Sequence, residues 1–287
     1  MSQSSNKPLV IGLGASDLAL GEYPGWLPTW YRPAPITPTS QVYMSEDEHF
    51  TEQGALNALR EALWADAEER EHARHKQAAY VVLDDFWANH AILSGDFRTL
   101  PAREVEEIVK AYFNDTFDLE GQSLEIRFEI QPGGRTLFTS AMSSWLHEGI
   151  LEVSASANVA VKSLRLCLPE MLNRTRHAVD GTPAMLVFVT APLLQAVMVE
   201  HDNWVAYDSL RLFPGDTDDA WRLAALTEQL FERSATTRRE DCTVYLYGAS
   251  IDPEPFESRF ACVLPMPLPM PAQENGSTAP RLMEYAR

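Results

Sequence analysis

The stretch from Leu124 to Ile130 constrains the fold most strongly, because apolar and charged side chains alternate strictly along it. The apolar positions are Leu124, Ile126, Phe128 and Ile130, and the charged positions are Glu125, Arg127 and Glu129. A period of two is typical of a β-strand with one face in a core and the other in water. The turn Pro132-Gly133-Gly134 leads into a second apolar stretch, Thr136 to Met142, so the sequence predicts a β-hairpin here.

Helical patterns alternate with strands of this kind along the chain. Residues Glu52 to Lys76 are rich in Ala, Glu, Arg and Leu and carry leucines on one face, which predicts a long helix. Pro101 is suited to begin a second helix, because the first turn of a helix leaves its backbone N–H groups without helical partners. Predicted hairpins lie beside crossovers in both halves of the chain. The sequence therefore predicts an α/β fold of two lobes with mixed sheets.

Changes in composition suggest how the chain is divided. We expect a first lobe over residues 1–180 and a second lobe over residues 181–264. Regular structure after the second lobe is opposed by Pro265, Pro267, Pro269 and Pro271. Proline lacks a backbone donor and fixes φ, so residues 265–287 are expected to be a flexible, proline-rich tail.

The balance of charge excludes several classes of partner. The 287 residues include 41 Asp and Glu against 23 Lys and Arg, a formal net charge of −18. Such a surface repels phosphate backbones and anionic lipid, so we expect no nucleic-acid partner and no direct membrane insertion. Three widely spaced cysteines favour reduced thiols over a disulfide framework. With a polar first segment and no apolar stretch of about 18 residues, the chain is expected to be cytoplasmic.

The stretch Gly12-Leu13-Gly14-Ala15-Ser16-Asp17 is the first candidate for ligand binding. A dinucleotide fingerprint needs a third glycine, where Asp17 stands, and a helix directly after it. The residues that follow favour a strand, so dinucleotide binding is not expected. No glycine in the chain is followed directly by Lys and then Ser or Thr, which excludes a Walker A phosphate loop.

Other pairs of chemically active side chains have ordinary structural explanations. His72 and His75 lie among glutamates and arginines of the predicted long helix, so we expect them on a solvated, ion-paired face and expect no metal. The pair Asp84-Asp85 favours a turn, and Asp218-Asp219 favours a helix N-cap. The motifs of hydrolase nucleophile elbows, zinc proteases and kinases are absent from the sequence. No catalytic residue is therefore predicted.

The order of the predicted elements resembles that of actin-like proteins over roughly residues 8 to 250. The opening Val10-Ile11-Gly12-Leu13-Gly14-Ala15-Ser16 is similar to their first loop, and the elements from Tyr80 to Leu168 are similar to an insert in their first lobe. The resemblance therefore implies an inserted α/β subdomain over about 78–158 within the first lobe. In particular, the chain resembles PilM-type assembly proteins of type IV pili and the cytoplasmic domain of GspL-type proteins of type II secretion. This resemblance implies a two-lobed, actin-like fold.

The sequence departs from this family where a nucleotide would bind. Actin-like ATPases open with Asp-x-Gly, whose Asp acts through a metal-bound water and whose Gly lets phosphate approach the backbone. Here Gly12 stands at the Asp position, while Gly14 and Ser16 remain, and no Asp in the chain is followed by Gly two positions later. Phosphoryl transfer depends on positioned charge. We therefore expect a degenerate phosphate loop, no cofactor and no ATP turnover.

The resemblance implies a scaffold that a partner recruits to the inner membrane. PilM-type proteins capture a short cytoplasmic peptide of an inner-membrane partner, and GspL-type domains contact an assembly ATPase, so both kinds of partner are expected. Trp87, Phe97, Tyr112 and Trp145 are the aromatic candidates for the peptide contact. Two alternatives stay open, namely a working actin-like ATPase and an unrelated α/β binding module.

Overall fold

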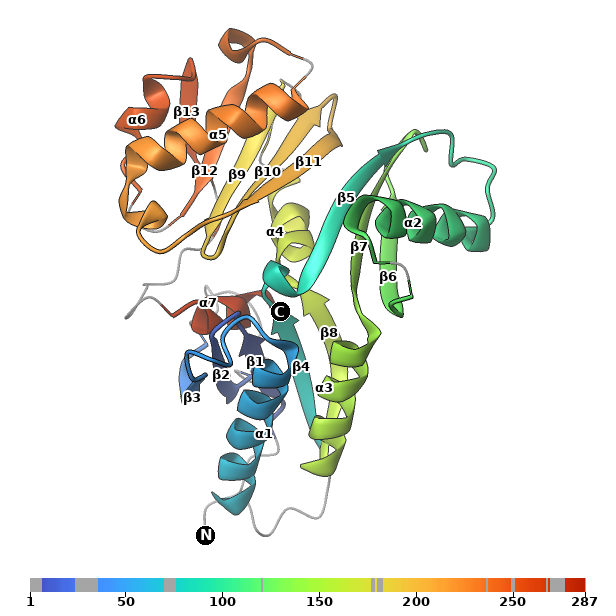
Figure 1. The fold of residues 1–287 in the computed structure, drawn as a ribbon, viewed down its shortest axis with the longest axis vertical. Coiled ribbons are helices and arrows are strands. Elements are labelled where there is room, and N and C mark those ends of the chain that lie inside the picture. The colour runs from blue at the N-terminus through green and yellow to red at the C-terminus, as the bar shows by residue number, and fades with distance from the viewer. Residues whose placement is uncertain are drawn as a thin grey trace, which may run out of the picture. The chain divides into compact units, whose positions relative to one another are not determined.

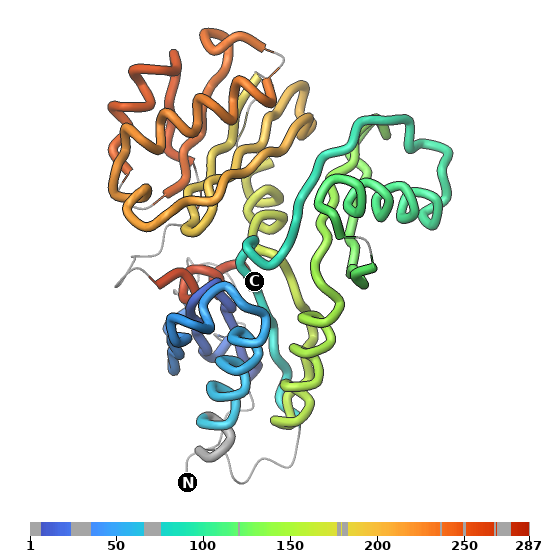
Figure 2. The backbone as a smooth tube through the Cα atoms, viewed as in Figure 1, coloured from blue at the N-terminus to red at the C-terminus, as the bar shows by residue number. Residues whose placement is uncertain are grey.

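The chain forms two compact units, each assembled from separated stretches of sequence (Figures 1 and 2). The computed structural model describes residues 7–23, 36–69, 76–119, 121–176, 179, 183–235, 237–248, 251–266, 268 and 277–286. Unit 1 consists of Met1–Trp87, Ser143–Met171 and Pro271–Arg287, and unit 2 of Ala88–Met142 and Leu172–Met270. The predicted mixture of helices and mixed sheets is confirmed.

Unit 1 is built on a five-stranded mixed sheet with the order β3-β2-β1-β4-β8. The strands are β1 (Leu9–Leu13), β2 (Asp17–Glu22), β3 (Pro38–Tyr43), β4 (Gln77–Leu83) and β8 (Val159–Leu166). The first three strands form an antiparallel meander, and β4 is parallel to both β1 and β8. The strand–turn–strand opening predicted from the sequence is thus the β1–β2 hairpin at the centre of this sheet.

Two longer helices pack on this sheet and on each other. Helix α1 (Glu52–Glu69) begins where the Thr51 hydroxyl accepts the backbone N–H of Gly54 at 3.0 Å. Helix α3 (Ser144–Ser156) is capped by Ser143, whose hydroxyl accepts the N–H of Leu146 at 3.4 Å. These caps satisfy backbone donors that a helix start leaves without partners.

The chain returns to unit 1 at its end, where the sequence predicted a flexible tail. Residues 277–286 instead contain helix α7 (Ala279–Met283) and the 3-10 turn η4 (Glu284–Ala286). Helix α7 packs against β1 and β2, and η4 packs against β4. Leu282, Met283 and Tyr285 are fully buried. For these ten residues the predicted tail is wrong. The prediction was based on the prolines that precede them and did not consider that their apolar side chains can fill a core. The remaining lobe boundaries, 1–180, 181–264 and the insert at about 78–158, stay predictions.

Unit 2 contains a second five-stranded sheet, with the order β11-β10-β9-β12-β13. The strands are β9 (Ala184–Thr190), β10 (Leu193–Glu200), β11 (Asn203–Arg211), β12 (Thr243–Tyr247) and β13 (Cys262–Pro265). Helix α5 (Ala220–Ser234) covers part of this sheet, and its core includes Met185, Leu223 and Phe256 (Figure 1). The predicted N-cap is confirmed, since the Asp219 carboxylate accepts the N–H of Arg222 at 3.0 Å.

A smaller sheet in unit 2 contains the hairpin that the sequence predicts most clearly. Its order is β5-β7-β6, and the elements are β5 (Ala88–Ser94), β6 (Leu124–Ile130), β7 (Thr136–Ser143) and the covering helix α2 (Ala102–Phe117). The turn between β6 and β7 has φ of +89° at Gly133 and +66° at Gly134, a conformation that glycine adopts without strain. The core between α2 and this sheet includes Val105, Val109, Phe113 and Leu137.

One glutamine joins the small sheet to the large sheet of unit 2. The side-chain amide of Gln131 donates to the carbonyl of Trp204 at 2.7 Å, and its oxygen accepts the N–H of Trp204 at 2.7 Å. Gln131 is 2% exposed, and the Trp204 ring also meets Phe138 edge to face. The paired hydrogen bonds satisfy a buried donor and a buried acceptor that no β-strand partner serves at this position.

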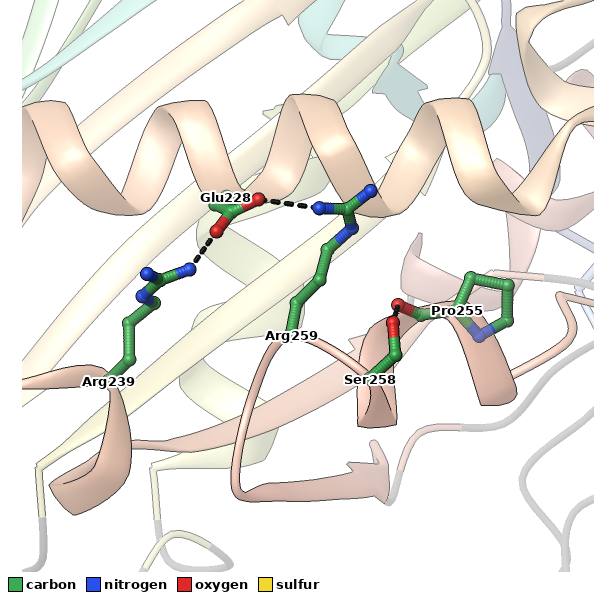
Figure 3. A network of polar contacts seen from close by, with 5 residues as sticks. All are labelled: Glu228, Arg239, Pro255, Ser258 and Arg259. Atoms are coloured by element: carbon green, nitrogen blue, oxygen red, sulfur yellow. Dashed lines mark hydrogen bonds and ion pairs between the residues drawn. The ribbon is translucent and has the colours of Figure 1, made fainter.

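A carboxylate on α5 gathers two arginines from the following connections (Figure 3). Glu228 accepts a hydrogen bond from Arg259 at 2.7 Å and pairs with Arg239 through its other oxygen. The Ser258 hydroxyl donates to the carbonyl of Pro255 at 2.7 Å in the same region. Glu228 therefore holds the segments before β12 and before β13 against α5.

Candidate functional site

The predicted phosphate loop lies at the turn of the β1–β2 hairpin. Gly12 belongs to β1, while the Gly14 N–H donates to the carbonyl of Asp17 at 2.8 Å and closes the turn. Gly12 and Gly14 are buried and Ser16 is half-buried. The turn is thus part of the unit 1 core and has little contact with solvent.

Neighbouring segments hold the carbonyl groups of this turn. The Trp87 indole donates to the carbonyl of Gly14 at 3.1 Å. Backbone N–H groups of Phe50 and Met44 donate to the carbonyls of Ala15 at 2.9 Å and Ser16 at 3.0 Å. Every one of these partners comes from unit 1, so the turn is fixed by its own unit.

Asp17 anchors the end of the chain to this turn. Its carboxylate accepts the N–H of Ala279 at 3.1 Å and the hydroxyl of Thr278 at 3.2 Å, and it also accepts the hydroxyl of Ser277. Asp17 is 2% exposed. A buried carboxylate requires such charge-assisted hydrogen bonds, because water cannot reach it.

The two glycines make room for the same segment. A Cβ atom built on Gly12 would lie 2.1 Å from the carbonyl oxygen of Ala279, and one on Gly14 would lie 2.7 Å from the Thr278 hydroxyl oxygen. Atoms cannot approach so closely without displacing the backbone. The close approach that the sequence assigned to a phosphate group is therefore made in this structure by residues 278–279 of the chain itself.

The sequence did not predict that Asp17 holds the end of the chain. Asp17 was noted only because a dinucleotide fingerprint would have a third glycine at its position. A usable signal lay at the other end of the chain, where Ser277 and Thr278 precede Ala279-Pro280. Hydroxyl residues followed by proline in the first turn are typical of a helix start. No pattern in the sequence, however, pairs that start with a carboxylate near residue 17.

Asp84 and Asp85 lie directly after β4, close to this anchor. Asp84 is 1% exposed, and burial together with the neighbouring Asp85 raises its pKa to about 7, opposed in part by Arg281 of the chain end. The predicted turn is confirmed, since Asp84 accepts the N–H of Phe86 at 2.9 Å. Asp85 accepts the N–H of Leu168 at 2.9 Å, at the start of helix α4 (Cys167–Thr175). Both carboxylates therefore accept hydrogen bonds from backbone N–H groups.

The four aromatic candidates for partner contact differ in exposure. Trp87 is 7% exposed, and Phe97 is 5% exposed within the core under α2. Tyr112 is half-buried against the same core. Trp145, on α3, is 51% exposed. Of the four, Trp145 presents the most surface to a partner, and partner binding at any of them stays a prediction.

No group of three or more His, Cys, Asp or Glu side chains in the described part of the chain is placed to hold a metal ion. The pair His72 and His75 lies outside the described residues. Cys242 is buried in the core of unit 2, and burial raises the pKa of its thiol to about 12, so it stays protonated. Among the described helices, none has the length and apolar character needed to span a membrane.

Comparison with known proteins gives a likeness in structure but not in sequence. No family model and no curated protein matches the sequence. A Bacteroides thetaiotaomicron VPI-5482 protein with an actin-like ATPase fold and unknown function matches with a TM-score of 0.59 and 10% identity, over 93% of this chain and 94% of that one. A PilM–PilN type IV pilus biogenesis complex matches with a TM-score of 0.59 and 15% identity, over 90% and 88%.

These matches define the class of fold. The chain has the two-lobed, actin-like α/β fold that its sequence predicted. Its likeness to PilM extends over nearly the whole of both chains. The cytoplasmic domain of EpsL, an inner-membrane component of the type II secretion system of Vibrio cholerae, also matches, with a TM-score of 0.49 and 12% identity over 91% and 90%. The resemblance to actin-like proteins and to PilM, found from the order of elements, is confirmed at the level of fold by the first two matches.

Proposed function

We propose that this protein is an actin-like scaffold of a type IV pilus or type II secretion platform, and that it binds partner proteins without turning over nucleotide. The observation that carries the proposal is the state of the β1–β2 turn. Residues 278–279 pack against Gly12 and Gly14, and Asp17 is engaged in holding them. A loop occupied in this way has no room for a phosphate group.

Two further features support the absence of turnover. Gly12 carries no carboxylate at the position where the family opens with Asp, and the sequence has no second Asp-x-Gly. Magnesium is bound through oxygen ligands, chiefly carboxylates and phosphates, and positioned charge is the main source of catalysis in phosphoryl transfer. Asp84 and Asp85 are buried, and each accepts a backbone N–H, which gives them a structural role in unit 1.

The proposed partner is an inner-membrane platform protein that offers a short cytoplasmic peptide. Support comes from the structural likeness to PilM in its complex with PilN, and from the exposed Trp145 on α3. Aromatic side chains are enriched at the centres of protein interfaces. Recruitment through such a peptide, with an assembly ATPase as a second partner, would keep the protein on the cytoplasmic face without membrane insertion.

Titration calorimetry with ATP and Mg²⁺, together with a phosphate-release assay, tests the proposed lack of turnover. We expect no binding heat and no release above the buffer rate. Binding with micromolar affinity, or ATP turnover, would instead support a working actin-like ATPase and overturn the proposal.

A second experiment tests the partner. Trp145→Ala is compared with Leu151→Ala, a control on the same helix whose side chain is 39% exposed. In-cell crosslinking to single-span pilus or secretion proteins should fall by about tenfold for Trp145→Ala, as for an interface hot spot, and change little for Leu151→Ala. Equal crosslinking by both variants would contradict the role of Trp145.

A further inference from the structure

The end of the chain is seated on unit 1 much as a bound peptide is seated on its receptor. We call residues 277–286 the C-terminal segment. Ser277, Thr278 and the N–H of Ala279 all donate to the Asp17 carboxylate. The Ser277 hydroxyl also accepts the side-chain amide of Gln41, which lies on β3. The first three residues of the segment are therefore held by hydrogen bonds to Asp17 and Gln41. We call the part of unit 1 that contacts the segment the receptor surface.

The rest of the segment supplies apolar and charged contacts. Leu282, Met283 and Tyr285 are fully buried, and a Cβ on Gly21 would lie 2.9 Å from the Met283 methyl group. The Glu284 carboxylate accepts the N–H of Ile36 at 2.6 Å. The segment is thus buried along most of its length and is held by hydrogen bonds near both ends.

Charge complementarity fixes one further position. Arg281 is 8% exposed and acts electrostatically on Asp84, which lies near Asp85 and Asp17. The guanidinium group lowers the pKa of Asp84 and so opposes part of the effect of burial and of Asp85. The receptor surface therefore favours a segment with two hydroxyl residues at a helix start, then an arginine, then apolar residues.

We propose that this surface of unit 1 is a peptide-recognition site that can take the C-terminal segment of a second copy of the chain. The segment of the same chain then acts as an internal competitor. Its fit is already seen, so an identical segment from another copy meets the same hydrogen bonds and the same core. Exchange of an identical element between copies is a simple route to a dimer. This inference is independent of the proposed scaffold function.

The chain's own segment competes with a segment from a second copy, and its advantage can be estimated from its effective concentration. A segment tethered to its receptor acts at an effective concentration of order millimolar, so the wild-type chain keeps its own segment in place. A second copy gains access in proportion to the fraction of receptors whose own segment is released. Weakening the segment without touching the receptor should therefore strengthen binding of a segment supplied in trans.

Two full-length variants separate receptor from ligand. The double variant Ser277→Ala/Thr278→Ala keeps Asp17 and the apolar surface but has a weakened segment. Asp17→Asn keeps the segment sequence but has a damaged receptor, so its segment is released more often. We expect each variant alone to sediment as a monomer, and an equimolar mixture to form a dimer in which one copy donates its segment to the other. A mixture that sediments as the sum of its monomers would overturn the proposal.

A peptide assay remains decisive if Asp17→Asn fails to fold. A fluorescein-labelled peptide of residues 275–287 is titrated with the wild-type chain and with the Ser277→Ala/Thr278→Ala variant. Hydrogen bonds to a charged group contribute enough that the variant should bind the peptide at least about tenfold more tightly. Equal affinity, or no binding to the variant, would show that the site takes only its own segment.

The control is Glu228→Gln, which weakens an ion-pair network in unit 2 and leaves the receptor surface intact. Its peptide affinity should equal that of the wild type. If Glu228→Gln also binds the peptide more tightly, general loosening of the chain explains the effect and the proposal fails.

Discussion

The carboxylate of Asp17 accepts the backbone N–H of Ala279 at 3.1 Å, although 262 positions separate the two residues in the sequence. This contact places the end of the chain against the β1–β2 turn, near the beginning of the chain. Because Asp17 lies at the start of β2, the same residue also borders the glycine turn. Asp17, which stands where a dinucleotide-binding motif would have its third glycine, therefore anchors the end of the chain.

Replacing Gly12 by alanine tests whether the glycine serves the C-terminal segment. The added methyl group would lie 2.1 Å from the carbonyl oxygen of Ala279, so the backbone of the segment must move. Overpacking of this kind costs about 1–3 kcal/mol. We expect a lower free energy of unfolding by that amount and faster amide exchange over residues 279–286, measured by denaturant titration and hydrogen exchange.

Gly149→Ala is the matched control for this substitution. Its added methyl group would meet the Leu56 side chain at 2.6 Å, and a side-chain end can rotate away where a backbone carbonyl cannot. Alanine also favours a helix over glycine by up to about 1 kcal/mol. We expect Gly149→Ala to be close to neutral. An equal loss for both variants would show that the backbone of residue 279 is not the obstacle.

Asp84→Asn should stabilise the protein at neutral and alkaline pH. Burial and Asp85 raise the pKa of Asp84 from 3.8 to about 7, so the folded state holds its proton where the unfolded state has lost it. Stability from this group is complete below about pH 4 and falls as pH rises to about 7. The advantage of Asp84→Asn should grow over that range, to the order of a few kcal/mol.

Denaturant titrations of the wild type and Asp84→Asn between pH 4 and pH 8 measure this difference. The amide oxygen that the substitution introduces can still accept the N–H of Phe86, so the turn is kept. A difference that does not change with pH would show that the ionisation of Asp84 does not oppose folding.

Gln131→Ala should weaken unit 2. It removes both partners of the Trp204 backbone, which leaves a buried N–H and a buried carbonyl without hydrogen bonds. Each such group costs about 1–3 kcal/mol, so for the two groups we expect a loss of about 2–6 kcal/mol. Gln122→Ala, at an exposed position, should change stability by less than about 0.5 kcal/mol. Comparable losses for the two variants would argue against a special role of Gln131.

Glu228→Gln should lower the stability of unit 2 by about 1–2 kcal/mol, because two arginines lose a shared, partly buried carboxylate. The loss should shrink at high salt, which screens the charges in the wild type as well. The exposed pair of Glu240 with Arg238 provides the comparison, and Glu240→Gln should have almost no effect. Thermal unfolding at low and high salt measures both. A loss of the same size for Glu240→Gln would contradict the importance of burial.

Local patterns in the sequence predicted many of the elements correctly. Alternation at Leu124 to Ile130 and the glycines at 133–134 predicted the β6–β7 hairpin, and the pair Asp218-Asp219 was predicted to cap a helix. These features depend on neighbours a few residues apart, whose geometry is fixed by backbone sterics and local hydrogen bonds. The order of such elements was enough to predict the actin-like fold.

The candidate site was less predictable, because its parts are distant in sequence. Gly12, Gly14 and Ser16 were identified as a degenerate phosphate loop, but nothing near them indicates residues 277–279. Trp87 and Phe97 have the same aromatic character as Trp145, yet two are buried and one is exposed. Composition cannot distinguish these cases, since an aromatic side chain suits a core and an interface equally well.

The sequence by itself predicted most of the strands and helices, the actin-like order of these elements, and the missing acid at position 12. Only the tertiary structure decided what lies over the glycine turn, because a buried carboxylate selects its partners by proximity in space and not along the chain. Asp17 meets Ser277, Thr278 and Ala279 because helix α7 packs on β1 and β2 and buries Leu282 and Met283, and that burial brings the donors within hydrogen-bonding distance.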